Sequence, residues 1–154
     1  DCMAINIDAQ FIACRSVIPL MKAQKSGVIL NMSSTSGLYG TPNRAAYTAS
    51  KWAVIGLTKT LAIELGPLVI CCYAICATSV EGDRIDRVLN SQAAVTGKSV
   101  EDIRQDYTAG TSLRRFAKAS EIADMCLFLA SESAAFVSGQ ALAVDGNTET
   151  YRLD

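Results

Sequence analysis

The stretch Gly-Val-Ile-Leu-Asn-Met-Ser-Ser (GVILNMSS), residues 27–34, decides the fold class of this 154-residue chain. A short apolar run that ends in small hydroxyl residues is typical of a buried strand in a parallel sheet. Residues 69–77 and 140–144 carry further apolar runs, and helical patterns occupy residues 1–25 and about 43–65. Strands separated by helices predict an α/β fold with a parallel sheet of about three strands joined by right-handed crossovers.

A tyrosine and a lysine stand four residues apart in the segment YTASK, from Tyr47 to Lys51. On a helix this spacing puts both side chains on one face, where the ammonium can favour the phenolate of a group whose free pKa is about 10. An exposed pair on an amphipathic helix would show the same spacing, so the flanking residues decide between the two interpretations. Ser34, thirteen residues before Tyr47, ends the first strand, at the edge of the sheet where ligands bind. We therefore expect the three side chains to converge on one pocket.

The stretches GVILNMSS and YTASKWAVIGLTKTLAIEL together closely resemble the short-chain dehydrogenase/reductase family, and the resemblance continues to residues 138–146. That family has a Rossmann-like, doubly wound parallel sheet, which the resemblance implies here as well. It also implies a catalytic tetrad and a nicotinamide cofactor, NAD or NADP, without a metal. The implied catalytic residues are Asn6, Ser34, Tyr47 and Lys51, and the implied cofactor-binding residues are Tyr47, Lys51, Ala77, Thr78 and Val80.

The family also suggests a role for each member of the tetrad. Tyr47 would exchange a proton with the substrate oxygen, and Lys51 would lower the pKa of the tyrosine and bind the nicotinamide ribose. Ser34 would donate a hydrogen bond to the developing oxyanion, and Asn6 would hold a water that links the lysine to solvent. The implied activity is hydride transfer between a secondary alcohol and a ketone, on a small-molecule alcohol or carbonyl substrate. The family further implies a cytoplasmic homodimer or homotetramer.

The glycine-rich turn that cradles the cofactor pyrophosphate has no counterpart, because the sequence contains neither GxGxxG nor GxxxGxG. We therefore expect residues 1–154 to be the C-terminal portion of a single NAD(P)-binding Rossmann-fold domain, with an incomplete sheet. Residues 81–107 are predicted to form a helical insertion that acts as a substrate lid. Ala77 and Thr78 replace the family's Pro-Gly, and a β-branched residue such as threonine resists a positive φ.

These departures keep a second interpretation open, in which the chain is a non-catalytic remnant that serves only as a folding or oligomerisation module.

The composition of the chain argues against several other classes of protein. A net charge of −1 gives no basic footprint for nucleic acid, and no apolar run approaches the ~20 residues that span a bilayer. Histidine is absent, which excludes a Ser-His-Asp triad and His-bearing zinc sites within the chain. We expect the six cysteines to be apolar residues of a reducing compartment, and we expect Ser120 to cap the helix that follows it.

Overall fold

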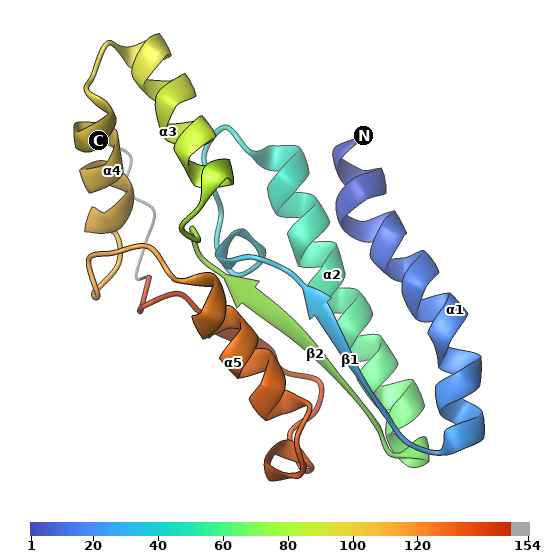
Figure 1. The fold of residues 1–154 in the computed structure, drawn as a ribbon. Helices are drawn as coiled ribbons and strands as arrows, with labels where there is room; N and C mark the ends of the chain where they lie inside the picture. Colours follow the sequence, from blue (N-terminus) through green and yellow to red (C-terminus); the bar gives the residue numbers. More distant parts are fainter. Residues whose placement is uncertain (149–154) are drawn as a thin grey trace.

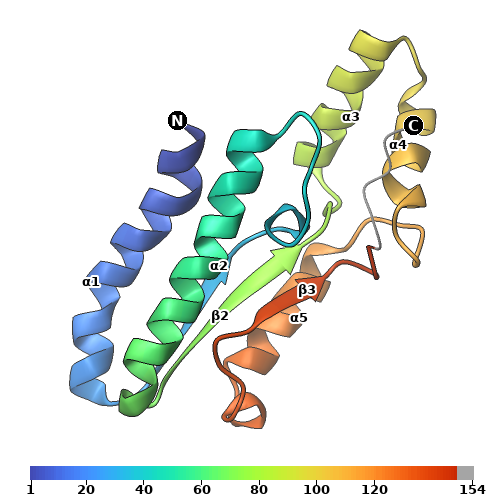
Figure 2. The ribbon, with the colours of Figure 1, turned by 180° about the vertical axis from the view of Figure 1, so that it is seen from behind.

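Three parallel strands form one sheet within residues 1–148, the part of the chain that the structure, a computed structural model, describes. They are β1 (Gly27–Met32), β2 (Ile70–Ala77) and β3 (Ala141–Val144), in the spatial order β1-β2-β3. The register pairs Met32 with Ile75 and Ala74 with Ala141. Because the three strands run in the same direction, their carboxyl ends meet at one edge of the sheet (Figure 1 for β1 and β2, Figure 2 for β3).

Helices cover both faces of this sheet. On one face lie α1 (Ala9–Gln24) and α2 (Ala45–Leu65), and on the other lies α5 (Ala119–Leu129) (Figures 1 and 2). The helices α3 (Asp83–Thr96) and α4 (Val100–Ala109) stand beyond the carboxyl end of β2. The predicted class is confirmed: the fold is α/β, with a Rossmann-like parallel sheet between helical layers. Its three strands match the number expected from the sequence.

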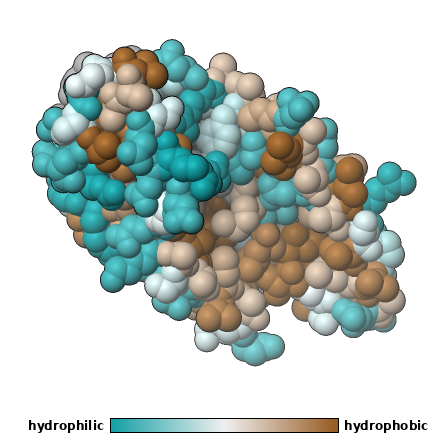
Figure 3. All heavy atoms as spheres, turned by 45° about the horizontal axis from the view of Figure 1, so that its top comes forward, coloured by the Kyte–Doolittle hydropathy of each residue, from teal (hydrophilic) through white to brown (hydrophobic). Residues whose placement is uncertain are grey.

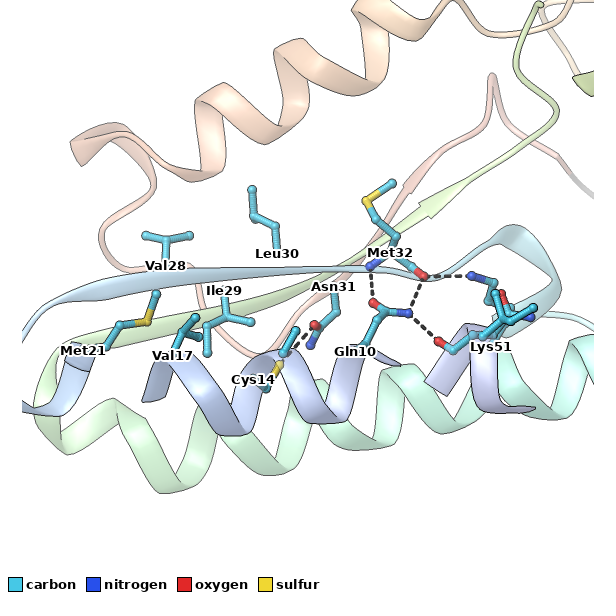
Figure 4. A pocket seen from close by; sticks show the side chains of 13 residues that line it. Gln10, Cys14, Val17, Met21, Val28, Ile29, Leu30, Asn31, Met32 and Lys51 are labelled. Atoms are coloured by element: carbon cyan, nitrogen blue, oxygen red, sulfur yellow. Dashed lines mark hydrogen bonds between the residues drawn. The ribbon is translucent and has the colours of Figure 1, made fainter. Parts of the chain in front are cut away.

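Alternating side chains of the strands build a separate apolar core on each face. Figure 4 shows Ile29 and Asn31 of β1 on the side of α1 and α2, while Val28 and Leu30 point the other way. The adjacent residues Cys71 and Cys72 likewise serve opposite cores, as expected for neighbours on a strand. The buried residues of the first core are Cys14, Ile29, Leu61, Leu65, Ile70 and Cys72, and those of the second are Tyr73, Ile75, Ala117, Ile122, Leu129 and Ala134.

The helix predicted over residues 1–25 is present, but it opens with a π-helical turn, Ala4–Asp8, that sequence patterns did not indicate. A π-helical turn accommodates one extra residue per turn and occurs frequently at functional sites. Asn6 is the central residue of this turn. Pro19 lies inside α1, which continues past it to Gln24.

Two expectations about helix boundaries need refinement. The helical insertion at 81–107 consists of two helices, α3 and α4, which separate at Gly97, a glycine in the left-handed conformation with φ of 73°. The expectation that Ser120 caps the next helix is wrong, because α5 begins at Ala119 and Lys118 is its cap residue. A carboxylate oxygen of Glu121 accepts the Lys118 backbone N–H at 2.8 Å, so an acidic side chain of the first turn bonds back to the N–H of the cap residue.

Within residues 1–148 no helix combines the length and the apolar character that crossing a membrane requires.

Candidate active site

Lys51 is a buried cation, only 7% exposed, on the face of α2 that meets β1. Its ammonium donates a hydrogen bond to the backbone oxygen of Met32, with an Nζ–O distance of 2.9 Å. The same ammonium lies 5.6 Å from the centre of the Tyr47 ring, within the range of a cation–π interaction. Burial lowers the pKa of Lys51, and the positive charge of Arg84 lowers it further. The predicted Tyr47–Lys51 pair is thus assembled on one face of α2.

A side-chain amide links Lys51 to the π-helical turn (Figure 4). Gln10 accepts the Met32 N–H at 2.7 Å and donates to the Met32 oxygen at 3.2 Å, as a neighbouring strand would. Its Nε2 also lies 2.6 Å from the backbone oxygen of Asn6. The Asn6 side chain donates to the backbone oxygen of Cys2 at 3.0 Å. Asn6 and Lys51 are therefore connected through Gln10 and a single carbonyl of β1.

Asn6, Gln10 and Lys51 line one end of an open pocket of about 460 Å³ between α1 and the outer edge of β1. The remainder of the lining is mostly apolar and comes from the inner face of α1 and from residues 28–32. In the space-filling view, apolar atoms gather in a hollow on this side of the molecule (Figure 3). Neither Ser34 nor Tyr47 belongs to this lining, so among the four predicted catalytic residues the pocket gathers only Asn6 and Lys51.

The two serines that follow β1, Ser33 and Ser34, have different surroundings. The Ser33 hydroxyl donates to the backbone oxygen of Lys51 at 2.9 Å, which ties the strand end to α2. The Ser34 hydroxyl accepts the N–H of Ser36 at 3.2 Å. Within residues 1–148 its own proton has no acceptor, so Ser34 keeps a free donor, while the donor of Ser33 is occupied. The family resemblance implies Ser34, and not Ser33, as the catalytic serine, and this assignment stays a prediction.

Tyr47 lies in the first turn of α2 and is half-buried. Its backbone oxygen accepts the Ser50 hydroxyl at 2.6 Å. The phenol hydroxyl makes no hydrogen bond to any residue in the described range 1–148, so both its proton and its lone pairs are available. A half-buried phenol without a hydrogen-bond partner in the described residues, beside a buried ammonium, can act in acid–base catalysis.

The expected cofactor-binding residues Ala77, Thr78 and Val80 are half-buried at the carboxyl end of β2. The Thr78 N–H donates to the backbone oxygen of Val144 at 3.3 Å, and Val80 forms an isolated bridge with Ala117. Thr78 is not one of the described residues with positive φ. The strain expected from a threonine in place of glycine is therefore absent, and its β-branched side chain is compatible with this backbone.

Comparison with known proteins places these features in a family. A family profile described as Enoyl-(Acyl carrier protein) reductase matches residues 1–147. The chain belongs to the short-chain dehydrogenase/reductase family. Its relatives include 2-(R)-hydroxypropyl-CoM dehydrogenase of Xanthobacter autotrophicus, 35% identical over 94% of this chain and 54% of that protein. Dehydrogenase/reductase SDR family member 6 of Aquarana catesbeiana is 36% identical over 94% of this chain and 57% of that protein.

Solved structures of the short-chain dehydrogenase/reductase family share the fold. Sorbitol-6-phosphate 2-dehydrogenase SrlD from Erwinia amylovora superposes with a TM-score of 0.91 at 25% identity, over 97% of this chain and 59% of that one. An NAD⁺-bound xylitol dehydrogenase superposes with a TM-score of 0.87 at 30% identity, over 94% of this chain and 58% of that one. The chain therefore spans little more than half the length of the relatives it matches.

Gln10 is the contributor to this site that sequence reasoning missed. Its position four residues after Asn6 puts the two on one helical face, and that spacing was the available signal. The partner of both Gln10 and Lys51 is a backbone carbonyl, that of Met32, which carries no signature in the sequence.

Proposed function

We propose that the polypeptide containing this sequence is an NAD(P)-dependent oxidoreductase that interconverts a secondary alcohol and a ketone. The observation that carries the proposal is the buried ammonium of Lys51 beside the unpartnered phenol of Tyr47. The ammonium lies 5.6 Å from the centre of the Tyr47 ring, and a phenol within hydrogen-bonding reach of a substrate oxygen can exchange a proton with it. Tyr47 would take the hydroxyl proton during oxidation of the alcohol and return it during reduction of the ketone.

Ser34 would stabilise the oxygen on which charge develops. Its free hydroxyl proton stands at the carboxyl end of β1, the edge of a parallel sheet at which ligands bind. Asn6 would act at a distance by fixing the π-helical turn and, with Gln10, the carbonyl that holds Lys51. A water held near this turn would connect the ammonium to solvent.

The residues present fit the nicotinamide end of the cofactor. Lys51 uses one of its three ammonium donors on Met32, which leaves two for ribose hydroxyls. Ala77, Thr78 and Val80 would line the nicotinamide beside Tyr47, and Thr78 can do so without backbone strain. The bound cofactor would supply the hydride acceptor or donor that amino-acid side chains lack. NAD and NADP both suit this end, since they differ at the adenosine ribose.

The proposal extends to the surroundings of the site. The α3–α4 unit would serve as the substrate lid, because the Arg44 guanidinium at the head of α2 donates to the Tyr107 hydroxyl of α4 at 3.4 Å. The substrate would be a small-molecule alcohol or carbonyl compound. All six cysteines are free, which fits the cytoplasm as the compartment.

A Tyr47→Phe variant tests the chemistry. Phenylalanine keeps the ring and its packing but removes the proton-transferring hydroxyl, so we expect turnover to fall by about 10²–10⁴-fold while cofactor affinity changes little. Tyr39→Phe, in the exposed loop before α2, is the matched control and should retain wild-type turnover. Hydride transfer is followed by the absorbance of the reduced nicotinamide. Wild-type turnover by the Tyr47 variant would exclude the proposed role.

A second candidate function is supported by exposed apolar side chains on the outer faces of α1 and α2. Phe11 and Ile12 on α1 are 53% and 61% exposed, and Trp52 and Ile63 on α2 are 51% and 79% exposed. Patches of this kind mark association surfaces. They favour a homodimer or homotetramer, and they would let the chain serve as an oligomerisation module even without turnover. Sedimentation velocity of wild type and of an Ile63→Lys variant tests this: the variant should dissociate, and an unchanged distribution would exclude the α2 face.

A further inference from the structure

Gln10 of α1 makes the backbone contacts that a neighbouring strand would make with the end of β1 (Figure 4). Its Oε1 accepts the Met32 N–H at 2.7 Å, and its Nε2 donates to the Met32 oxygen at 3.2 Å. Paired strands use the same two backbone groups of alternate residues. A primary amide offers an acceptor and two donors, so a single side chain satisfies both groups of Met32 on the side away from β2.

The orientation of this amide is determined by its surroundings. Nε2 of Gln10 lies between two acceptors, the backbone oxygens of Met32 and Asn6, and its distance to the Asn6 oxygen is 2.6 Å. Oε1 faces a donor, the Met32 N–H. A reversed amide would place an oxygen against two oxygens and a donor against a donor, so only one orientation satisfies all three partners. Gln10 is therefore fixed between the π-helical turn and β1.

The Met32 oxygen accepts two hydrogen bonds, one from Gln10 and one from the Lys51 ammonium at 2.9 Å. Together they occupy both lone pairs of this oxygen. The peptide group that contains the oxygen is also held from the other side, because the Ser33 N–H donates to β2 at 2.8 Å. Within residues 1–148 the Met32 oxygen is the only hydrogen-bond acceptor of the buried ammonium. The direction of one carbonyl therefore sets the place of the lysine charge.

We propose that Gln10 is a positioning residue, which fixes the Lys51 ammonium beside Tyr47 by holding the carbonyl that the ammonium binds. The proposal rests on the function proposed above, in which Lys51 and Tyr47 act together, and it adds a residue outside the tetrad. Gln10 acts through a backbone oxygen and not on the reacting atoms. Without its amide, this carbonyl loses one of its two partners, and the ammonium can move with it into the open pocket that Gln10 and Lys51 both line.

Chemical acetylation measures the position of Lys51 without any turnover. In the protein that contains this sequence, acetic anhydride should modify Lys51 slowly, because its side chain is buried and hydrogen-bonded. Gln10→Met keeps an unbranched side chain of similar length but lacks the amide. Acetylation of Lys51 should then become about tenfold faster, the effect of one hydrogen bond that involves a charged group. Exposed Lys25, at the end of α1, is the internal reference, and peptide mass spectrometry gives both rates.

Two controls separate positioning from a general loosening of α1. Gln24→Met, at the exposed far end of the same helix, should leave the acetylation of Lys51 unchanged. Cys14 is 5% exposed and lies about one turn after Gln10, so its alkylation by iodoacetamide reports detachment of the helix. In Gln10→Met, Cys14 should react at the wild-type rate. A rise equal to that at Lys51 would show that the whole helix has detached, and the proposal would be wrong.

Kinetic measurements test whether the effect of Gln10 passes through the lysine. With 2-butanol or cyclohexanol as the alcohol, and the reduced nicotinamide followed by absorbance, Gln10→Met should lower kcat about tenfold. The same substitution in a Lys51→Met background should lower kcat no further, because residues that act through one another give non-additive effects. A merely structural contribution of Gln10 would lower kcat equally in both backgrounds, and that result would overturn the proposal.

The two measurements can fail separately. If Gln10→Met leaves the acetylation of Lys51 at the wild-type rate, the positioning role is excluded whatever the turnover. If wild type oxidises neither alcohol but the acetylation of Lys51 still depends on Gln10, the proposed function fails and the positioning of the ammonium stands. Faster acetylation with an unchanged kcat would refute the link to catalysis, because the reaction would not need the ammonium in its observed place.

Discussion

A Gly37→Ala substitution should lower the free energy of unfolding by about 2–4 kcal/mol. Gly37 ends the turn Thr35–Gly37 that follows Ser34. A Cβ at this position would lie 2.5 Å from Ser33 Oγ and 2.9 Å from the backbone oxygen of Lys51. Overpacking of this kind typically costs about 1–3 kcal/mol, and breaking the Ser33–Lys51 hydrogen bond adds roughly 0.5–1.5 kcal/mol. The clash also moves the turn that holds Ser34, so turnover should fall together with stability.

Urea denaturation followed by tryptophan fluorescence measures the effect, since Trp52 is the only tryptophan and adjoins Lys51 on α2. Gly56→Ala is the matched control. Gly56 lies inside α2 with nothing within 4 Å of a Cβ added there, so alanine should raise stability by up to about 1 kcal/mol through its helix propensity. The reasoning is refuted if the Gly37 variant unfolds at the wild-type urea concentration, or if both variants lose stability equally.

Two further predictions concern the core and the edge of the sheet. Burial raises the pKa of the Cys72 thiol from 9.0 to about 12, so the folded state keeps a proton that the unfolded state loses above pH 9. The free energy of unfolding should therefore fall as the pH rises from 9 to 12, and it should fall less steeply in the Cys72→Ala variant. Urea titrations at several pH values measure this, and equal slopes for wild type and variant would contradict the prediction. At the outer edge of β1, the Met32 N–H bonds to Gln10, whereas the N–H of the next residue, Ser33, bonds to β2. Backbone N–H groups alternate in direction along a strand, so the N–H of Val28, four residues before Met32, also points away from β2. A strand edge with unpaired backbone groups can pair with another chain, so Val28→Pro should reduce the self-association measured by light scattering. Ile29→Pro, which removes an N–H that bonds to β2, should instead unfold the protein. Undiminished self-association of the Val28→Pro variant would exclude this edge.

The order of helices and strands was predictable because its signals are local. The apolar run at residues 27–34 and the periodic pattern at about 43–65 gave β1 and α2 to within two residues of their observed ends. The end of α2 at Leu65 follows from Gly66 and Pro67, because glycine and proline commonly terminate helices. Local chemistry also misled once, because Ser120 has a side chain typical of a cap residue, but α5 begins one residue before it and Lys118 occupies the cap position.

The candidate site was only partly predictable, since its most specific contacts involve the backbone. Spacing identified Tyr47 and Lys51 as partners, and the 5.6 Å separation of the ammonium from the ring agrees with it. Spacing could not reveal that Lys51 is held by the carbonyl of Met32, or that Gln10 shares that acceptor. The π-helical turn around Asn6 was equally hidden, because the composition of Ala4–Asp8 is ordinary for a helix. Such features depend on how elements pack and have no pattern of their own.

Because Gln10 and Lys51 share the backbone oxygen of Met32 as acceptor, the position of the lysine charge depends on the register of β1. The Met32 side chain is 42% exposed, so its identity matters little to Lys51, which bonds only to the backbone. In the observed register Met32 pairs with Ile75, and its carbonyl faces away from β2. A slip of β1 by one residue would turn that carbonyl toward β2 and exchange the faces of every side chain. The ammonium would then lie buried without an acceptor, a state that costs several kcal/mol. A chain with misaligned strands would therefore expose Lys51 to solvent and lose the position of its charge beside Tyr47.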